Sequence, residues 1–193
     1  MSKSNLSILA EVAIFSAIAL VFDKLPLFTM PQGGSVSLVM LPILLLALRH
    51  GFGVGILTGG IVGTIQLFYG GYFLNVFQVF LYYALAYAGI GLAGLLAPTL
   101  HKQNKLPQAS LVISLAALLG GSIRLLATFL SGIIFYADYA PAGKPVWLYS
   151  FTYNISYILP STIIACILLI LLYKTRPRFF DCFDMLYAII GTL

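Results

Sequence analysis

Long runs of apolar residues alternate with short polar segments along this 193-residue chain. The runs continue for about 15 to 30 residues, whereas the strands of an outer-membrane barrel are ~10-residue segments of alternating polarity. Because lipid offers no hydrogen-bond partners to the backbone, such runs predict membrane-spanning helices. We expect an all-α integral membrane protein with six transmembrane helices, at residues 7–22, 35–49, 52–70, 73–97, 108–136 and 146–173.

The composition supports this class. Hydrophobic residues make up 61% of the chain and charged residues 8%, which excludes an ordinary soluble protein. The first run has no small-residue cleavage site after it, so we interpret it as a membrane helix and not as a signal peptide. We expect one membrane domain over residues 1–175 and a cytoplasmic tail over 176–193.

Basic residues predict the orientation in the cell membrane. If both termini are cytoplasmic, only Lys24 and Lys144 fall on the extracellular side of the membrane. Seven basic residues then lie on the cytoplasmic side: Lys3, Arg49, Lys102, Lys105, Lys174, Arg176 and Arg178. The net charge of +5 fits an interaction with anionic lipid and does not indicate a nucleic-acid partner.

Small residues stud two of the predicted helices. Those of the third are Gly51, Gly53, Gly55, Gly59, Gly60 and Gly63. No Gly-Lys-Ser/Thr follows them, so they indicate close helix packing and not a phosphate loop, and the chain shows no means of hydrolysing ATP. On the first helix, Ala13 and Ala17 form a small-xxx-small pair, which packs inside the bundle or docks another membrane subunit.

Polar and aromatic side chains share faces in three predicted helices. They are Asn75, Gln78, Tyr82 and Tyr83; Arg124, Thr128, Gly132 and Tyr136; and Tyr149, Ser150, Tyr153, Asn154 and Tyr157. Their spacings of three, four and seven residues bring side chains to one helix face. Tyrosines, amides and an arginine at one end of a bundle suit recognition of a small aromatic or heteroaromatic molecule.

Arg124 is costly inside a bilayer unless it is paired or hydrated, and no acidic residue lies in the middle of a predicted span. It either satisfies backbone carbonyls and snorkels, or it lines a watery pocket and meets a ligand. We find no paired carboxylates, no nucleophile–base spacing and no metal-ligand spacing, and His50 and His101 fall at predicted corners. We therefore expect no catalytic residues, metal or cofactor. The rival classes, a membrane-embedded enzyme acting on a lipid-like substrate and a channel or proton-coupled carrier, would need acidic or histidine clusters.

Three stretches carry a family resemblance. They are Pro31–Leu38, Met40–Gly51, and the run from Gly132 through Tyr136 and Pro145 to Asn154. Together they resemble the thiamine-specific S-components of energy-coupling factor (ECF) transporters, over most of residues 8–175. The resemblance implies a six-helix, vitamin-capturing subunit that docks on a transmembrane scaffold with two ATPases.

The resemblance also implies roles for residues. The family's scaffold-contact motif matches Ala13 and Ala17, its ligand contacts on the last helix match Tyr149 and Asn154, and its aromatic near the end of the fifth helix matches Tyr136. Its lid matches 23–34. We expect the substrate site to comprise Tyr82, Tyr83, Arg124, Thr128, Tyr136, Tyr149 and Asn154.

Two positions depart from the family pattern. Relatives commonly place an acid where this chain has Tyr82, and a histidine where it has Thr128. A cationic ligand 4–6 Å from Arg124 would meet roughly 3–4 kcal/mol of repulsion at an effective dielectric of 20, against ~0.5–2 kcal/mol from tyrosine faces. This balance opposes thiamine unless Asp23 or Asp138 supplies a negative charge. The default ligand is still thiamine or a thiamine-related heteroaromatic, because the resemblance spans the chain; the alternative is a neutral or anionic vitamin or precursor.

Overall fold

The computed structural model describes residues 3–30, 34–69, 76–141 and 143–181. These residues form six helical rods and one short hairpin. The rods are α1 (Lys3–Lys24), α2 (Met40–His50), α3 (Phe52–Phe68), a composite rod over Val76–Leu100, α7 (Leu106–Phe135) and α8 (Val146–Thr175). The predicted all-helical membrane bundle is thereby confirmed, and four of the rods are long and apolar enough to cross a bilayer.

The composite rod changes its winding along its length. It contains α4 (Val76–Val79), the π-helix η1 (Phe80–Leu85), α5 (Ala86–Ile90), the 3-10 helix η2 (Gly91–Leu96) and α6 (Ala97–Leu100). A π-turn admits one more residue per hydrogen-bonded ring than an α-turn, and such turns are frequent at functional sites. The change of winding therefore marks the part of the rod that carries Tyr82 and Tyr83.

The predicted second span is shorter than expected. Residues Ser35–Val36 form β2, which pairs antiparallel with β1 (Phe28–Thr29), and α2 begins only at Met40. Eleven residues rise about 16 Å, too little to cross a bilayer. Helix α2 is instead a buried core helix, with Ile43, Leu44 and Leu46 fully covered by its neighbours.

Close backbone contacts hold α3 against the composite rod. A Cβ added at Gly59 would overlap the carbonyl of Tyr87, and one at Gly63 would overlap the carbonyl of Tyr83. Only glycine permits such approach, and in lipid this packing is a main source of helix association. The predicted packing role is confirmed for Gly55, Gly59 and Gly63, whereas a Cβ at Gly51, Gly53 or Gly60 would meet nothing within 4 Å.

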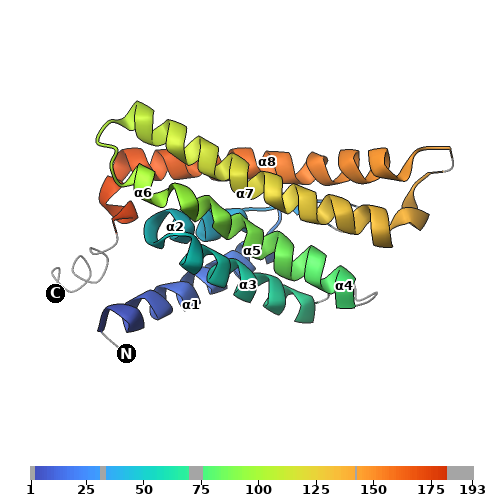
Figure 1. Ribbon diagram of the computed structural model, residues 1–193, viewed down its shortest axis with the longest axis horizontal. Helices are drawn as coiled ribbons and strands as arrows, with labels where there is room; N and C mark the ends of the chain where they lie inside the picture. The colour runs from blue at the N-terminus through green and yellow to red at the C-terminus, as the bar shows by residue number, and fades with distance from the viewer. Residues whose placement is uncertain (1–2, 31–33, 70–75, 142, 182–193) are drawn as a thin grey trace.

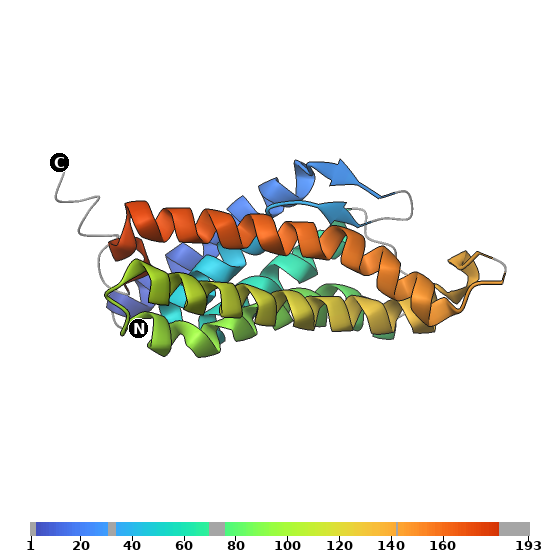
Figure 2. The same ribbon diagram turned by 90° about the horizontal axis from the view of Figure 1, so that it is seen from above.

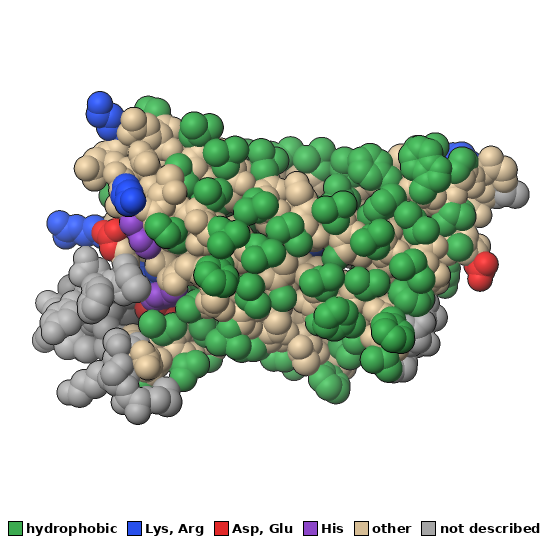
Figure 3. All heavy atoms as spheres, in the orientation of Figure 1, with side chains coloured by type: hydrophobic (Ala, Val, Ile, Leu, Met, Phe, Trp, Pro, Cys, Tyr) green, Lys and Arg blue, Asp and Glu red, His purple; other side chains and the backbone are tan. Residues whose placement is uncertain are grey.

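The long helices α7 and α8 lie side by side, and the beginning of α1 and the end of α8 lie at the same end of the bundle (Figure 1). Figure 3 shows hydrophobic side chains along the length of one face and basic side chains gathered at that end. The 3-10 helix η4 (Pro177–Phe180) folds back there, and Phe180 is buried in the core. A further 3-10 turn, η3 (Ala137–Tyr139), follows α7 at the opposite end.

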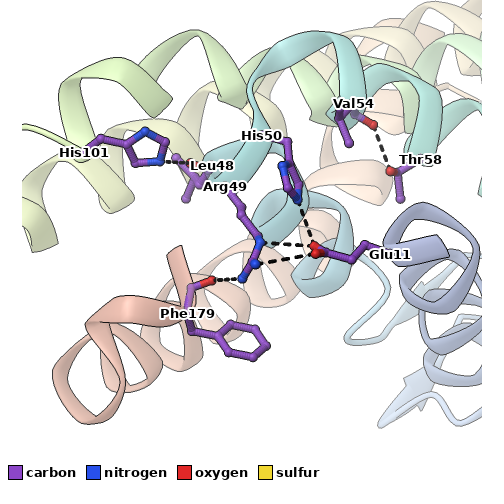
Figure 4. A network of polar contacts seen from close by, with 8 residues as sticks. All are labelled: Glu11, Leu48, Arg49, His50, Val54, Thr58, His101 and Phe179. Carbon is purple, nitrogen blue, oxygen red and sulfur yellow. Dashed lines mark hydrogen bonds and ion pairs between the residues drawn. The ribbon is translucent and has the colours of Figure 1, made fainter. Parts of the chain in front are cut away.

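A buried polar cluster ties three elements together at the basic end (Figure 4). Arg49 Nε lies 3.1 Å from Glu11 Oε2, and His50 Nε2 lies 2.8 Å from the same oxygen. Arg49 Nη1 also donates to the carbonyl of Phe179 at 2.6 Å. Arg49, which the sequence placed among the basic residues of the membrane surface, is thus 2% exposed and has a resident counter-ion. The cluster joins α1, α2 and η4.

Candidate functional site

A cavity of about 440 Å³ opens between the helices at the end away from this cluster. Its walls come from the end of α1, the β1–β2 hairpin, α3, the composite rod, α7 and α8. Nine of the chain's twelve tyrosines line it: Tyr69, Tyr82, Tyr83, Tyr87, Tyr136, Tyr139, Tyr149, Tyr153 and Tyr157. A volume of this size is typical of small-molecule sites.

The structure brings all seven predicted substrate residues to this cavity. Tyr82, Tyr83, Arg124, Thr128, Tyr136, Tyr149 and Asn154 all line it. The i, i+4 spacing on α7 accounts for part of the convergence, whereas Tyr149 and Asn154 lie five residues apart on α8 and reach the cavity from adjoining faces of that helix. Asn75, which the sequence placed on the same face as Tyr82, lies outside the described residues. Whether the seven bind a substrate stays a prediction.

Several lining residues were not predicted, among them Gln66, Tyr69 and Tyr87. Tyr87 lies five residues after Tyr82, a spacing that falls between the faces of an α-helix. In the π-helix over Phe80–Leu85 the hydrogen bonds run from residue i to i+5, so residues five apart come nearly into line. A search for aromatic residues at five-residue spacing would have found Tyr87. Gln66 is a single polar residue in an apolar run, and its only sequence signal is that isolation.

Arg124 is 5% exposed and lies against Tyr87. Its Nη2 donates to the Tyr87 hydroxyl at 3.2 Å, and its guanidinium carbon stands 4.7 Å from the centre of that ring. Within the described residues, Nε and Nη1 are buried without a hydrogen-bond partner. The sequence left two interpretations of Arg124 open. The structure does not show a side chain that snorkels toward the membrane surface: Arg124 is held in the cavity wall by the ring of Tyr87.

In this conformation Thr128 does not replace the family's histidine as a polar contact for a ligand. Its hydroxyl donates to the carbonyls of Arg124 and Leu125, at 3.0 and 3.1 Å. This back-bonding to the preceding turn is the usual arrangement for threonine inside a helix. The Thr128 hydroxyl is therefore already bonded to the backbone of its own helix.

Asn154 is 5% exposed and connects two neighbours on α8. Its Oδ1 accepts from the hydroxyl of Tyr157 at 2.7 Å, and its Nδ2 donates to the Ser150 carbonyl at 2.8 Å. The rings of Tyr149, Tyr153 and Tyr157 follow one another at 5.8 and 6.1 Å. We call these three tyrosines the aromatic ladder of α8. Asn154 fixes the position of its last member, Tyr157, along one wall of the cavity.

Facing that wall, Tyr82 contacts both Tyr83 and Tyr136, with ring centroids 5.1 and 6.3 Å apart. The hydroxyl of Tyr136 accepts a hydrogen bond from the fully buried Gln78 at 3.1 Å. Tyr136 follows the last residue of α7 and caps that helix. The second wall is therefore aromatic as well, and the Tyr82 and Tyr157 side chains of the two walls lie within hydrogen-bonding reach of each other.

The hairpin covers one side of the cavity, alongside α8 (Figure 2). Gly34 has a φ of +85°, and a Cβ there would come within 2.8 Å of the Tyr157 ring. The backbone nitrogen of Ser37 donates to the hydroxyl of Ser161 at 3.3 Å. Gly34, the last residue of the segment that the resemblance identified with a lid, therefore lies against the Tyr157 ring.

Asp23 and Lys24 also line the cavity, at the end of α1. Lys24 Nζ donates to the carbonyl of Tyr69 at 3.1 Å. Asp23 thus supplies a carboxylate to the cavity, one of the two possibilities left open by the sequence, whereas Asp138 is exposed and is not among the lining residues. The fixed charges of the described lining are Asp23, Lys24 and Arg124.

Ala13 and Ala17 take no part in the cavity. Both are exposed on α1, on the face turned away from the bundle, while Val12, Ser16 and Ala19 face inward and are buried. Packing of this pair within the bundle is therefore not what the structure shows. Whether the exposed face docks a partner stays a prediction.

Comparison with known proteins decides the family. The family model described as Thiamine transporter protein matches residues 9–181. This chain belongs to the thiamine transporter protein family. The thiamine transporter ThiT of Bacillus subtilis (strain 168) is 40% identical over 176 residues, which cover 88% of this chain and 92% of that protein.

Two further members of the thiamine transporter family agree with this assignment. ThiT of Lacticaseibacillus paracasei is 28% identical over 187 residues, 93% of each chain. A solved structure of ThiT from Listeria monocytogenes has a TM-score of 0.85 at 29% identity, covering 92% of this chain and 98% of that one. The resemblance to thiamine-type S-components is confirmed, and so is the expectation of a membrane transport protein and not an enzyme.

Proposed function

We propose that this chain is the substrate-capture subunit of an ECF-type importer in the cell membrane, and that it binds thiamine or a thiamine-related heteroaromatic. The observation that carries the proposal is the tyrosine-walled cavity of about 440 Å³ in a member of the thiamine transporter family. Aromatic walls bind flat heterocycles by stacking, and tyrosine faces attract a cation by ~0.5–2 kcal/mol each.

The binding step follows from the arrangement of the walls. A ring that enters the cavity stacks on tyrosine faces of the α8 ladder or of Tyr136, and displaces water from apolar surface. Asp23 at the end of α1 offsets the positive charge of Arg124 and Lys24, so a cationic ligand meets a net charge of about +1 and not +2. The hairpin then closes over the ligand.

Transport needs partners, because the chain carries no motif for ATP hydrolysis. We propose that the exposed face of Ala13 and Ala17 docks on a transmembrane scaffold subunit with two attached ATPases. Small side chains let helix backbones approach closely, and a bulky one blocks that approach. The cavity then faces outward and both termini are cytoplasmic.

Ala13→Trp tests the docking step. Uptake of radiolabelled thiamine by cells that carry the chain and an ECF module should be abolished, while thiamine affinity of the purified variant stays within twofold of the parent. Leu126→Trp, at an exposed position of α7 away from that face, is the matched control for a bulky residue in lipid. Surviving uptake in Ala13→Trp, or a parallel loss of binding, would exclude this docking face.

One observation favours a second ligand class, a neutral or anionic heteroaromatic vitamin or precursor. Arg124 has two buried donors without a partner among the described residues, and a guanidinium offers donors only. An acceptor brought by the ligand would satisfy them. The neutral aminopyrimidine half of thiamine is the simplest probe of this alternative.

A paired titration separates the two ligand classes. The purified parent and Tyr82→Glu proteins are titrated calorimetrically with thiamine and with the neutral aminopyrimidine. If the site lacks negative charge, the glutamate raises thiamine affinity by about 10-fold or more. Tight thiamine binding by the parent without a gain from Tyr82→Glu would show that Asp23 and the tyrosines suffice.

A further inference from the structure

The contact between Arg124 and Tyr87 bears on how one cavity can admit a cation beside an arginine. The guanidinium carbon lies 4.7 Å from the Tyr87 ring centre, and Nη2 donates to its hydroxyl at 3.2 Å. The ring and the hydroxyl therefore act on the guanidinium together. A cation over an aromatic face is attracted by the ring quadrupole, and a desolvated site strengthens that attraction.

Tyr87 is itself held firmly. It is 5% exposed, and its backbone lies against the glycine stripe of α3: a Cβ at Gly59 would overlap the Tyr87 carbonyl, and one at Gly63 would lie 3.1 Å from the Tyr87 Cβ. A backbone packed this closely has little freedom to shift. The tyrosine is thus a fixed platform, and the arginine is the movable member of the pair.

The arginine has a reason to leave this platform. Its Nε and Nη1 are buried without a partner in the described part of the chain, and an unpaired buried donor is destabilising. A guanidinium that swings from the wall into the cavity would gain water or a ligand acceptor. It would also bring its full charge against any bound cation. One hydroxyl and one ring thus hold the charge in the wall against this gain.

We infer that Tyr87 sets the charge selectivity of the cavity by retaining the Arg124 guanidinium in the wall, where it leaves room for a cationic heteroaromatic. The inference rests on the proposed function of the cavity and adds to it a residue outside the predicted set. Tyr87 is a positioning residue in this role: it acts on the ligand through Arg124. Losing the hydroxyl frees the arginine, which disfavours a cation and favours an acceptor-bearing neutral ring.

The test is a double-mutant cycle in which the measured quantity is the ratio of thiamine affinity to aminopyrimidine affinity. Parent, Tyr87→Phe, Arg124→Met and the double variant are purified at full length and titrated with thiamine and with the neutral aminopyrimidine. Tyr87→Phe keeps the ring and removes only the hydroxyl. We expect it to lower the ratio of thiamine affinity to pyrimidine affinity by about tenfold. In the Arg124→Met background the same change should alter the ratio by less than about twofold.

Tyr149→Phe in the same two backgrounds is the matched control, because Tyr149 lines the same cavity on α8. Its effect on the ratio should be equal with and without the arginine. Arg124→Met alone gives an independent readout and should raise the ratio. An unchanged ratio in Tyr87→Phe, or an equal shift in both backgrounds, would overturn the role of Tyr87 while leaving the proposed function intact. If the parent binds neither ligand, the proposed function fails and this inference fails with it.

Discussion

Two buried arginines stand at opposite ends of this protein, and their surroundings differ. Arg49 is 2% exposed and lies 3.1 Å from a carboxylate, with a carbonyl and an aromatic ring as further neighbours. Arg124 is 5% exposed and has an aromatic hydroxyl and ring, with two donors unpaired among the described residues. A buried charge with a resident counter-ion maintains structure, whereas one without is poised to respond to a ligand.

Removing the resident counter-ion should have the largest effect. Glu11→Ala leaves Arg49 buried without its carboxylate, and we expect the protein to lose about 3–5 kcal/mol of stability. Glu11→Gln, which keeps an acceptor, should lose less. The measurement is chemical denaturation of both variants in detergent. A loss below about 1 kcal/mol for Glu11→Ala would erase the distinction between the two arginines.

Ligand affinity should be nearly unaffected by that change at the far end. A fall in thiamine affinity that tracks the loss of stability would mean that α1 couples the Glu11 cluster to the cavity, which Asp23 and Lys24 of the same helix also line. In that case the Glu11 cluster and the cavity would be energetically coupled and not independent.

Asn154→Ala should act at the cavity end only. It leaves the Tyr157 hydroxyl, now 2.7 Å from Asn154 Oδ1, without its acceptor and loosens the tyrosine ladder. We expect a loss of about 1–3 kcal/mol in binding, with a smaller change in stability than Glu11→Ala. Isothermal titration measures the first quantity and denaturation the second. Unchanged affinity would remove Asn154 from the site.

Two glycines with the same backbone strain give the smallest and most selective comparison. Gly34 and Gly143 have φ values of +85° and +83°, but only Gly34 has a neighbour, the Tyr157 ring, where a Cβ would point. Both alanine variants should lose roughly 1 kcal/mol of stability. Only Gly34→Ala should also speed ligand dissociation, by about fivefold, in a stopped-flow experiment. Equal dissociation rates would show that the hairpin does not retain the ligand.

The sequence predicted the helical bundle and most of the cavity because both depend on local periodicity. Hydrophobic runs define the rods, and spacings of three and four residues bring Arg124, Thr128 and Tyr136 to one wall. Tyr87 was missed because the π-helix changes that periodicity. The start of the second helix was placed too early because the pairing of Ser35–Val36 with Phe28–Thr29 is a tertiary feature of an otherwise continuous apolar run.

Charge pairing was the least predictable feature. Glu11 and Arg49 are 38 residues apart, and nothing in either segment reveals that α1 and α2 bring them together. Asp23 reaches the cavity at the end of α1, which continues to Lys24, two residues beyond the predicted boundary at residue 22. Both findings change the electrostatic balance of the molecule without changing its fold.

The placement of the single tryptophan has a consequence for optical measurements. Trp147 is 56% exposed at the start of α8 and is not among the cavity residues, whereas nine tyrosines are. A change in indole emission on ligand addition should therefore come from altered energy transfer out of the nearby cavity tyrosines, of which Tyr149 is two residues away, and not from contact between the ligand and Trp147. Exciting the tyrosines and the indole separately distinguishes that transfer from a direct contact.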